Sequence, residues 1–305
     1  MPQLTNPPPH IYGASLDRAA KRRPDLDWLA RERAAPKTRV LLMSELEVLV
    51  ADGGEPRAMM PTIADLGRPL PDEALFLGAD DTGSLFAADI GADLPNGSPS
   101  GRFVELRTVG AALPASEAGL CAYARGLAFW HARNRFCGAC GAPTRSEQGG
   151  HVRRCTSCGA QHFPRSDPAV IVLVTHHHPI HGERCLMGSA PRFPPGLYST
   201  LAGFVEPGES LEETVRREVY EEAGLELFAI DYRSSQPWPF PASLMLGFRA
   251  RAMSDDLTID PEELRDAGWF TKAELRDPER RPVKLPNPDS IARHLIEEWL
   301  VEFAR

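Results

Sequence analysis

Four cysteines at regular spacing constrain this chain more than any other feature. Cys137 and Cys140 form one C-x-x-C pair, and Cys155 and Cys158 form a second, which gives C-x2-C-x14-C-x2-C. A glycine follows each pair and can adopt the left-handed backbone that a metal knuckle requires. The segment 137–160 has few apolar side chains and cannot form a core of its own. We therefore expect one Zn²⁺, bound by all four thiolates, to fold this segment.

A shell of four thiolates leaves no position for water, so the expected zinc is structural. Two unrelated pairs of buried or redox-active cysteines are the competing interpretation, which the spacing disfavours. Six arginines against the single Glu147 give residues 131–165 a local charge of +5. Such a surface is either a solvated face or a contact for nucleic acid. Cys121 and Cys185 lie beside apolar residues and are interpreted as core side chains.

The chain of 305 residues is long enough for more than one domain. Apolar runs separated by Gly/Asp turns predict strands over 39–103, in a β-rich N-terminal domain that covers 1–132 and ends in a linker helix. The zinc segment is expected to occupy 133–164. Strands interleaved with one well-marked helix predict a mixed α/β domain over 165–305. The fold class is therefore α+β multidomain.

Charge and hydropathy exclude several classes of protein. The chain has 34 basic and 42 acidic residues, a net charge of −8, which works against indiscriminate binding to phosphate backbones. The longest apolar stretch, 169–174, is too short to span a membrane. The first dozen residues lack the basic and apolar regions of a secretion signal. We therefore expect a cytoplasmic protein with no membrane contact.

The segment 203–225, GFVEPGESLEETVRREVYEEAGL, carries the clearest chemical signal. On a helix, Glu218 and Glu222 lie about 40° apart and Glu221 lies about 60° to the other side of Glu218. Like charges this close need a cation, and oxygen ligands suit Mg²⁺ or Mn²⁺. On charge alone, a solvated acidic face with neighbouring arginines as counter-charges is the more economical explanation.

The complete segment favours the metal site over the solvated face, because it matches the pattern G-x5-E-x7-R-E-U-x-E-E-x-G-U at every fixed position. The fixed positions are filled by Gly203, Glu209, Arg217, Glu218, Val219, Glu221, Glu222, Gly224 and Leu225. The segment therefore resembles the Nudix box. The resemblance implies an α/β/α sandwich that hydrolyses a nucleoside diphosphate linked to another group.

The resemblance also implies roles for single residues. Glu218 and Glu222 become metal ligands, and Glu221 becomes a further ligand or the general base, an assignment that stays open because Nudix enzymes differ in it. Glu209 and Arg217 become the ion pair that fixes the loop against the helix. The implied catalytic residues are Glu218, Glu221 and Glu222.

Two further metal contacts are implied outside the box. One is the carbonyl of Ala202, which precedes the box. The other is a glutamate in the segment DPEELRDAGWF, which aligns best with Glu263, with Glu262 as the adjacent competitor.

The segment 235–243, SQPWPFPAS, follows the box. Its alternating prolines enforce an extended, stiff backbone that displays aromatic faces, suited either to stacking on a nucleobase or nicotinamide ring or to packing on the core. It resembles the array that marks the NADH pyrophosphatase subfamily of Nudix hydrolases. The substrate contacts that this resemblance implies are Gln236, Pro237, Trp238, Pro239, Phe240, Pro241 and Ala242, together with Phe163 and Ala292.

With the zinc segment and the β-rich N-terminal domain, the resemblance covers essentially the whole chain. It implies a homodimer that cleaves NAD(H) into NMN(H) and AMP, and, as in bacterial members, removes the NAD cap from RNA 5′ ends. Two alternatives remain open from the residues. One is a Nudix hydrolase of another nucleoside diphosphate derivative such as ADP-ribose, and the other is a catalytically silent zinc-ribbon protein that binds RNA.

Overall fold

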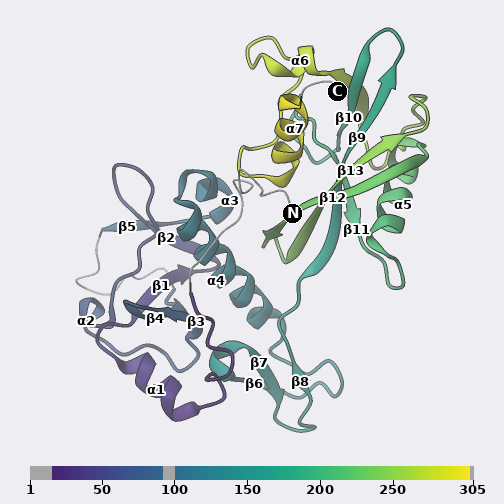
Figure 1. The fold of residues 1–305 in the computed structure, drawn as a ribbon. Helices are drawn as coiled ribbons and strands as arrows, with labels where there is room; N and C mark the ends of the chain where they lie inside the picture. The colour runs from purple at the N-terminus through teal and green to yellow at the C-terminus, as the bar shows by residue number, and fades with distance from the viewer. Residues whose placement is uncertain (1–15, 92–99, 303–305) are drawn as a thin grey trace. The chain divides into compact units, whose positions relative to one another are not determined.

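The computed structural model describes residues 16–91 and 100–302 and separates into two compact units. In the described ranges, one unit contains the N-terminal domain, the cysteine segment and residues 238–242. The other contains residues 167–237 and 243–302. The cysteine segment therefore shares one unit with the N-terminal domain, although it forms a sheet of its own (Figure 1).

The N-terminal domain is built on a five-stranded sheet in the order β3-β4-β1-β2-β5, in which β1 and β4 are parallel and the other pairs are antiparallel. Its strands are β1 (Arg39–Ser44), β2 (Glu47–Ala51), β3 (Leu75–Asp80), β4 (Gly83–Asp89) and β5 (Gly101–Val104). Its helices are α1 (Leu26–Ala34), α2 (Ile63–Leu66), α3 (Leu106–Val109), the 3₁₀ turn η1 (Gly110–Ala112) and α4 (Ala115–Arg133).

Alternation along β1 explains why this sheet is covered on both faces. Val40 and Leu42 pack in the cluster that contains Trp28 of α1, whereas Leu41 packs in the cluster that contains Trp130 of α4. Successive side chains of a strand point to opposite faces, so β1 supplies both cores. The expected linker helix is thus a core element of the N-terminal domain.

The cysteine segment forms a three-stranded antiparallel sheet. Its elements are β6 (Thr144–Glu147), the 3₁₀ turn η2 (Gln148–Gly150), β7 (Val152–Cys155) and β8 (Gln161–His162). His151 bonds to the carbonyl of Phe76 in β3 at 2.9 Å, and His131 of α4 bonds to the carbonyl of Gly150 at 2.7 Å. These buried polar contacts fasten the segment to the N-terminal domain.

The C-terminal domain is a mixed six-stranded sheet in the order β12-β13-β9-β10-β14, with β11 paired to β9. Its strands are β9 (Asp167–His178), β10 (Gly182–Ser189), β11 (Leu201–Phe204), β12 (Leu227–Trp238), β13 (Ser243–Ala252) and β14 (Asp266–Thr271), and its helices are α5 (Leu211–Ala223), α6 (Lys272–Arg276) and α7 (Ile291–Val301).

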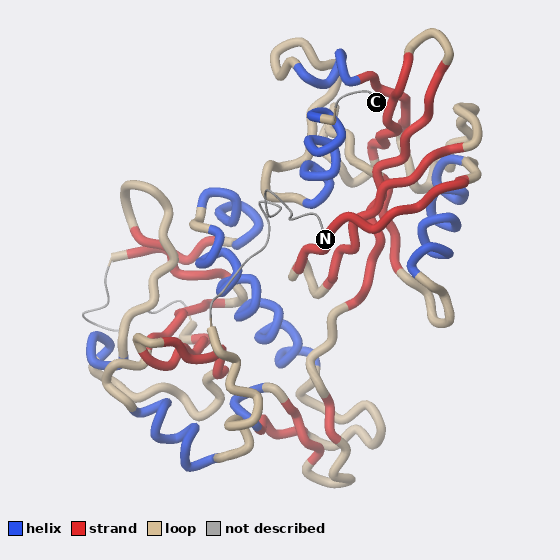
Figure 2. The backbone as a smooth tube through the Cα atoms, in the orientation of Figure 1, coloured by secondary structure: helices blue, strands red, loops and turns tan. Residues whose placement is uncertain are grey.

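Helices α5 and α7 lie on opposite faces of this sheet (Figure 2). Val172 of β9 packs in the cluster that contains Val219 of α5. The next residue, Leu173, packs with Trp299 of α7, which is fully buried. An apolar run on both sides is what a strand between two helical layers requires. The α/β/α sandwich that the Nudix resemblance implies is therefore present.

The two large sheets share one topology. In each, the first strand of the domain lies at the centre, between its antiparallel hairpin partner and a parallel strand that comes from a later hairpin. They differ in the segment that connects β2 to β3 in the N-terminal domain and β10 to β12 in the C-terminal domain. The C-terminal domain places β11 and α5 there, whereas residues 52–74 of the N-terminal domain contain only the four-residue α2. The N-terminal domain therefore repeats the sheet without the acidic helix.

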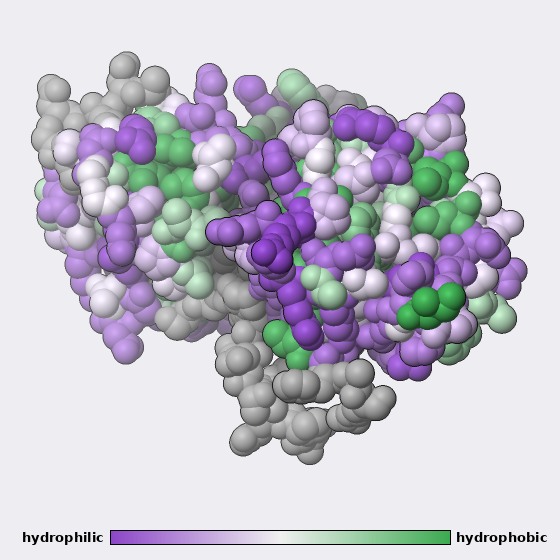
Figure 3. Space-filling model, turned by 90° about the horizontal axis from the view of Figure 1, so that it is seen from above, coloured by the Kyte–Doolittle hydropathy of each residue, from purple (hydrophilic) through white to green (hydrophobic). Residues whose placement is uncertain are grey.

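Hydrophilic residues cover most of the surface seen in Figure 3, and hydrophobic residues are scattered over it in small patches. Isolated exposed apolar residues are normal for a folded protein. Within the described ranges, no helix is both long and apolar enough to cross a membrane.

Candidate active site and zinc site

The acidic helix α5 begins and ends at defined residues. The hydroxyl of Ser210 accepts a hydrogen bond from the backbone of Glu213, whose carboxylate accepts one from the backbone N–H of Ser210 at 2.8 Å. This reciprocal capping box satisfies two donors at the helix start. At the other end Gly224 adopts φ of 70°, a left-handed conformation that favours glycine. The glutamates between these two caps therefore have fixed positions around the helix.

Arg217 bonds to several residues of the site. Its guanidinium donates to both carboxylate oxygens of Glu209, at 2.6 and 3.0 Å, and to the carbonyl of Phe204 at 2.8 Å. The same group donates to Glu218 and Glu221, at 2.9 Å each. Its hydrogen bonds are the main cause that lowers the pKa of Glu209 to about 2. Arg217 therefore ties the loop before α5 to the helix and stays charged.

Glu222 is a buried carboxylate, with 7% of its surface exposed. Its pKa is raised to about 8, chiefly by burial and then by the negative charges of Glu218 and Glu263. The backbone N–H of Ala202 donates to it, and the positive charge of Arg192 acts in the opposite direction. A buried acid beside other acids is unstable as an anion unless a cation accompanies it. This donor set fits a divalent cation with oxygen ligands.

Glu218 fills space that a glycine leaves free. A Cβ atom at position 203 would lie 2.0 Å from either carboxylate oxygen of Glu218, so no residue larger than glycine fits without displacing this glutamate. Burial is also the main cause that raises the pKa of Glu218. The fixed glycine of the box is thus explained by the carboxylate that lies over it.

The remaining acidic residues are more exposed. Glu221 has a side chain that is 54% exposed and is held by Arg217. Glu263 lies in an exposed turn whose Asp260 donates its backbone N–H to the carbonyl of Glu222 at 3.2 Å. Among the described residues, no three of these carboxylates bring their oxygens within 4.8 Å of one another. Glu222 and Glu218 are therefore the most enclosed part of the site.

The stability of the metal-free protein is expected to fall as pH rises through the range set by Glu222. Its pKa is about 8 in the folded chain against an ordinary value of 4.5, so the folded state binds more protons between these values. The contribution of Glu222 is therefore fully present below about pH 4.5 and is lost as pH rises to about 8. Thermal unfolding of wild type and Glu222→Gln at pH 5 to 9 in chelator measures this, and the gap between them should widen in favour of the variant. Parallel curves would contradict the assignment.

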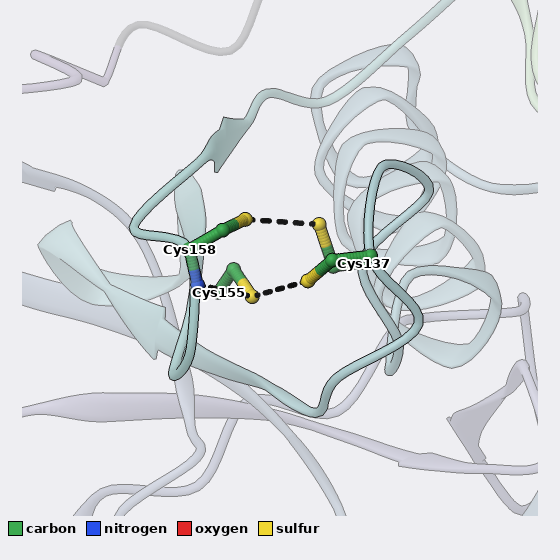
Figure 4. Close-up of side chains that lie close together, drawn as sticks. Cys137, Cys155 and Cys158 are labelled. Atoms are coloured by element: carbon green, nitrogen blue, oxygen red, sulfur yellow. Dashed lines mark hydrogen bonds between the residues drawn. The ribbon is translucent and has the colours of Figure 1, made fainter.

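The four cysteines converge. The sulfur atoms of Cys140 and Cys155 are 3.4 Å apart, those of Cys137 and Cys158 are 3.7 Å apart, and all four lie within 4.8 Å of one another. Tetrahedral Zn–S bonds of about 2.3 Å require S–S distances of about 3.8 Å. Figure 4 shows the labelled cysteines with their sulfur atoms turned toward one another. This chemistry and spacing fit one structural zinc ion.

Donors around Cys137 favour the thiolate form of this side chain. The N–H of Ala139 donates to the Sγ of Cys137, and the ring of His162 in β8 lies 3.4 Å from the same sulfur. Donors from the backbone and then from His162 lower the pKa of the Cys137 thiol. The thiolate is the form that coordinates zinc.

The proline-aromatic segment divides into enclosed and accessible side chains. Gln236 is fully buried, and its amide donates to the carbonyl of Asp289 at 2.6 Å and accepts from the backbone of Ile291 at 2.8 Å. It thereby fixes the start of α7. Trp238 and Phe240 are half-buried, and their rings meet edge to face at 5.0 Å. Pro239 is buried, Pro237 and Pro241 are exposed, and Ala242 is half-buried.

The other two expected substrate contacts differ in exposure. Phe163 has 58% of its surface exposed, whereas Ala292 has 4% exposed and belongs to the core beneath α7. Sequence reasoning also missed two residues beside the glutamates. Phe204 lies within the box and is 59% exposed, and Arg192 acts electrostatically on Glu222. The position of Phe204 in the box was an available signal, whereas nothing local distinguishes Arg192.

The sandwich, the capped acidic helix and the four-cysteine ribbon together define a zinc-ribbon pyrophosphohydrolase of the Nudix type. Family models agree along the chain. The NUDIX domain matches residues 165–292, an NADH pyrophosphatase-like rudimentary NUDIX domain matches 37–130, and an NADH pyrophosphatase zinc ribbon domain matches 132–163. The rudimentary domain corresponds to the sheet that lacks the acidic helix.

Curated relatives extend over most of the chain. The NAD-capped RNA hydrolase NudC of Deinococcus radiodurans is 37% identical, over 88% of this chain and 89% of its own length. The human NAD-capped RNA hydrolase NUDT12 is 34% identical, over 93% of this chain and 72% of its own length. NudC of Stutzerimonas stutzeri is 43% identical, over 71% and 72%. The chain belongs to the Nudix hydrolase family, in its zinc-ribbon NADH pyrophosphatase group.

Proposed function

We propose that this protein hydrolyses the pyrophosphate bond of NAD(H), giving NMN(H) and AMP, and removes the NAD cap from RNA 5′ ends. The observation that carries the proposal is the enclosed carboxylate pair of Glu218 and Glu222 on the capped helix α5, whose joint ionisation a divalent cation would stabilise. The substrate is supported by the SQPWPFPAS array and by the activity in the names of the relatives.

Glu218 and Glu222 would hold Mg²⁺ or Mn²⁺, with Glu263 and the carbonyl of Ala202 as further contacts. The bound metal supplies charge neutralisation for the pyrophosphate and a lowered pKa for the attacking water. Burial of Glu222 keeps bulk water away from its carboxylate. Arg217 binds Glu209 and the carbonyl of Phe204 in β11. These two contacts hold the loop before α5 in place and so fix the glutamates of α5 relative to β11.

Glu221 and Glu222 differ in the proton chemistry that they can perform. Glu221 is exposed and lies at the end of the guanidinium of Arg217. An exposed carboxylate can take a proton from water and release it to solvent. Glu222 is enclosed and suited to ligation. We therefore assign the general base to Glu221 and ligation to Glu222.

The aromatic side chains of Trp238, Phe240 and Phe163 are the proposed contacts for the base and nicotinamide rings. Phenylalanine at 163 offers a stacking face without a hydroxyl, so it recognises a ring by shape and not by a hydrogen bond. The exposed fraction of Phe163 leaves that face accessible.

Product analysis tests the function directly. Purified protein with Mg²⁺ or Mn²⁺ is offered NADH, NAD⁺, ADP-ribose and a short NAD-capped RNA in parallel. NMN(H) and AMP are expected from the dinucleotides, and RNA with a 5′ monophosphate from the capped substrate. Cleavage of ADP-ribose alone would refute NAD(H) as the substrate but leave Nudix chemistry in place. No cleavage with either metal would favour a silent RNA-binding protein.

We also infer two further properties: a homodimer, which the family resemblance implies, and residence in the cytoplasm, which is the expectation from the sequence. Light scattering of the purified protein measures the first point, with an expected mass of twice the 33.5 kDa chain. A monomer at assay concentrations would overturn it.

A further inference from the structure

The turn Trp238–Ala242 joins β12 to β13 and is poor in backbone donors. Pro239 and Pro241 have no N–H, and the N–H of Phe240 is already bonded to the carbonyl of Trp238 at 2.8 Å. A turn of this kind cannot fix itself through a ladder of backbone hydrogen bonds. Its carbonyls therefore need donors from elsewhere.

The donor for Pro239 comes from α4, which belongs to the same compact unit as this turn. Arg125 donates to the carbonyl of Pro239, and its guanidinium lies over the ring of Phe240 at 4.7 Å from the centroid. Glu105 lies 3.8 Å from the same guanidinium and supplies the counter-charge. The side chain of Arg125 is only 12% exposed. One enclosed cation thus makes both a hydrogen bond and a cation–π contact with the turn.

Packing around this contact is complementary. Phe240 packs against the apolar cluster that α4 shares with its sheet. The next residue of the helix, Gly126, lies beside Pro239: a Cβ at position 126 would stand 3.7 Å from the proline Cβ, an ordinary van der Waals contact, so the helix and the turn pack closely here without a clash. These contacts hold the partly exposed Phe240 against α4.

Trp238 is oriented through Phe240. The two rings meet edge to face at 5.0 Å, with 75° between their planes. Only the edge of one ring meets the face of the other in this geometry, and Trp238 stays half-exposed. Fixing Phe240 therefore fixes the indole while leaving part of it accessible.

We propose that Arg125 is a positioning residue for substrate binding: it anchors Pro239 and Phe240 so that the indole of Trp238 is held ready to stack on an aromatic ring of the dinucleotide. This inference rests on the proposed function, because it takes a ring-bearing dinucleotide as the substrate. It also gives the N-terminal domain a part in recognition.

The test compares Arg125→Met and Arg125→Lys with wild type. Methionine keeps most of the length and loses the charge and the donors, whereas lysine keeps the charge and loses the planar fork. KM for NADH is expected to rise on the order of tenfold in Arg125→Met, with kcat within about twofold, and to rise less in Arg125→Lys. Arg107→Ala, an exposed arginine of α3 in the same domain, is the matched control and should leave both constants unchanged.

Equilibrium binding of NADH in chelator, followed by its fluorescence, separates this inference from the proposed function. If wild type binds NADH without cleaving it, the proposed function fails, and weaker binding by Arg125→Met still supports the anchor. Unchanged KM and unchanged binding in both variants would overturn the anchor, as would the absence of NADH binding in wild type. If Arg125→Met does not fold, the same criteria apply to Arg125→Lys. An equal fall of kcat in both variants without a change in KM would indicate a structural role only and would also overturn it.

Discussion

Glu222→Gln is expected to reduce kcat for NADH by at least about 10³-fold, because it removes a charged ligand from the most enclosed part of the site. The side chain keeps its size, and the amide does not carry the cost of burying a negative charge. The fold is therefore expected to persist, with thermal stability in chelator at pH 8 equal to or above that of wild type. Steady-state kinetics with Mg²⁺ and Mn²⁺, with unfolding curves on the same samples, measure both effects.

Glu212→Gln is the matched control for this experiment. Glu212 lies in the first turn of the same helix and is exposed, so its loss of charge should change kcat by less than about twofold. A Glu222→Gln enzyme that keeps a tenth or more of the wild-type kcat would refute the ligand role. Equal losses in the two variants would point to the overall charge of α5 instead.

Loss of zinc is expected to have the second large effect, on folding. Cys155 is buried and its sulfur lies 3.4 Å from that of Cys140, so Cys155→Ser breaks the four-sulfur shell. Because the segment lacks a core, its folding free energy comes largely from the metal, on the order of 10 kcal/mol for structural zinc sites. We expect one zinc per chain in wild type, less than half an ion in the variant, and a thermal transition that is lowered or absent.

Cys121→Ala provides the control for zinc content. This cysteine is buried in the core of the N-terminal domain, where burial raises the pKa of its thiol to about 12, so it is not available as a thiolate. The variant should keep one zinc per chain. Wild-type protein that contains no zinc, or a Cys155→Ser protein that keeps a full ion, would contradict the structural site.

Local sequence signals predicted those parts of the fold that depend on neighbouring residues. The strand-rich N-terminal region, the ribbon and the sandwich are all present. The expected helix within 203–225 was well defined because its caps, Ser210 and Gly224, adjoin it. The helix expected at the end of the N-terminal domain corresponds to α4, whose role in the core of that domain was not foreseen. Trp130 and its neighbours pack against a sheet formed by distant residues, and such pairing leaves no local trace.

In the candidate site, too, contacts between neighbouring residues were predicted, and contacts between distant residues were not. Arg217 and its glutamate partners lie within one motif, so the resemblance to the Nudix box already implied the ion pair of Glu209 with Arg217. The proline pattern indicated an extended segment with exposed aromatic rings. It did not indicate which of its side chains are buried in the folded protein. Gln236 is enclosed because α7, more than fifty residues later, needs its amide. Arg125 and Pro239 are separated by 114 positions, and no periodicity connects them.

The repeated sheet topology means that the chain contains two copies of one framework, and the two copies differ in the cost of burying a charged carboxylate. The C-terminal copy encloses Glu222 and thereby carries a free-energy penalty that a cation relieves. The N-terminal copy has only α2 where the acidic helix would stand, and so it carries no such penalty. A rise of pH through the range set by Glu222, in the absence of a divalent cation, should consequently weaken the C-terminal copy. The N-terminal copy has no counterpart of α5, so no acidic helix gives it the same response to metal.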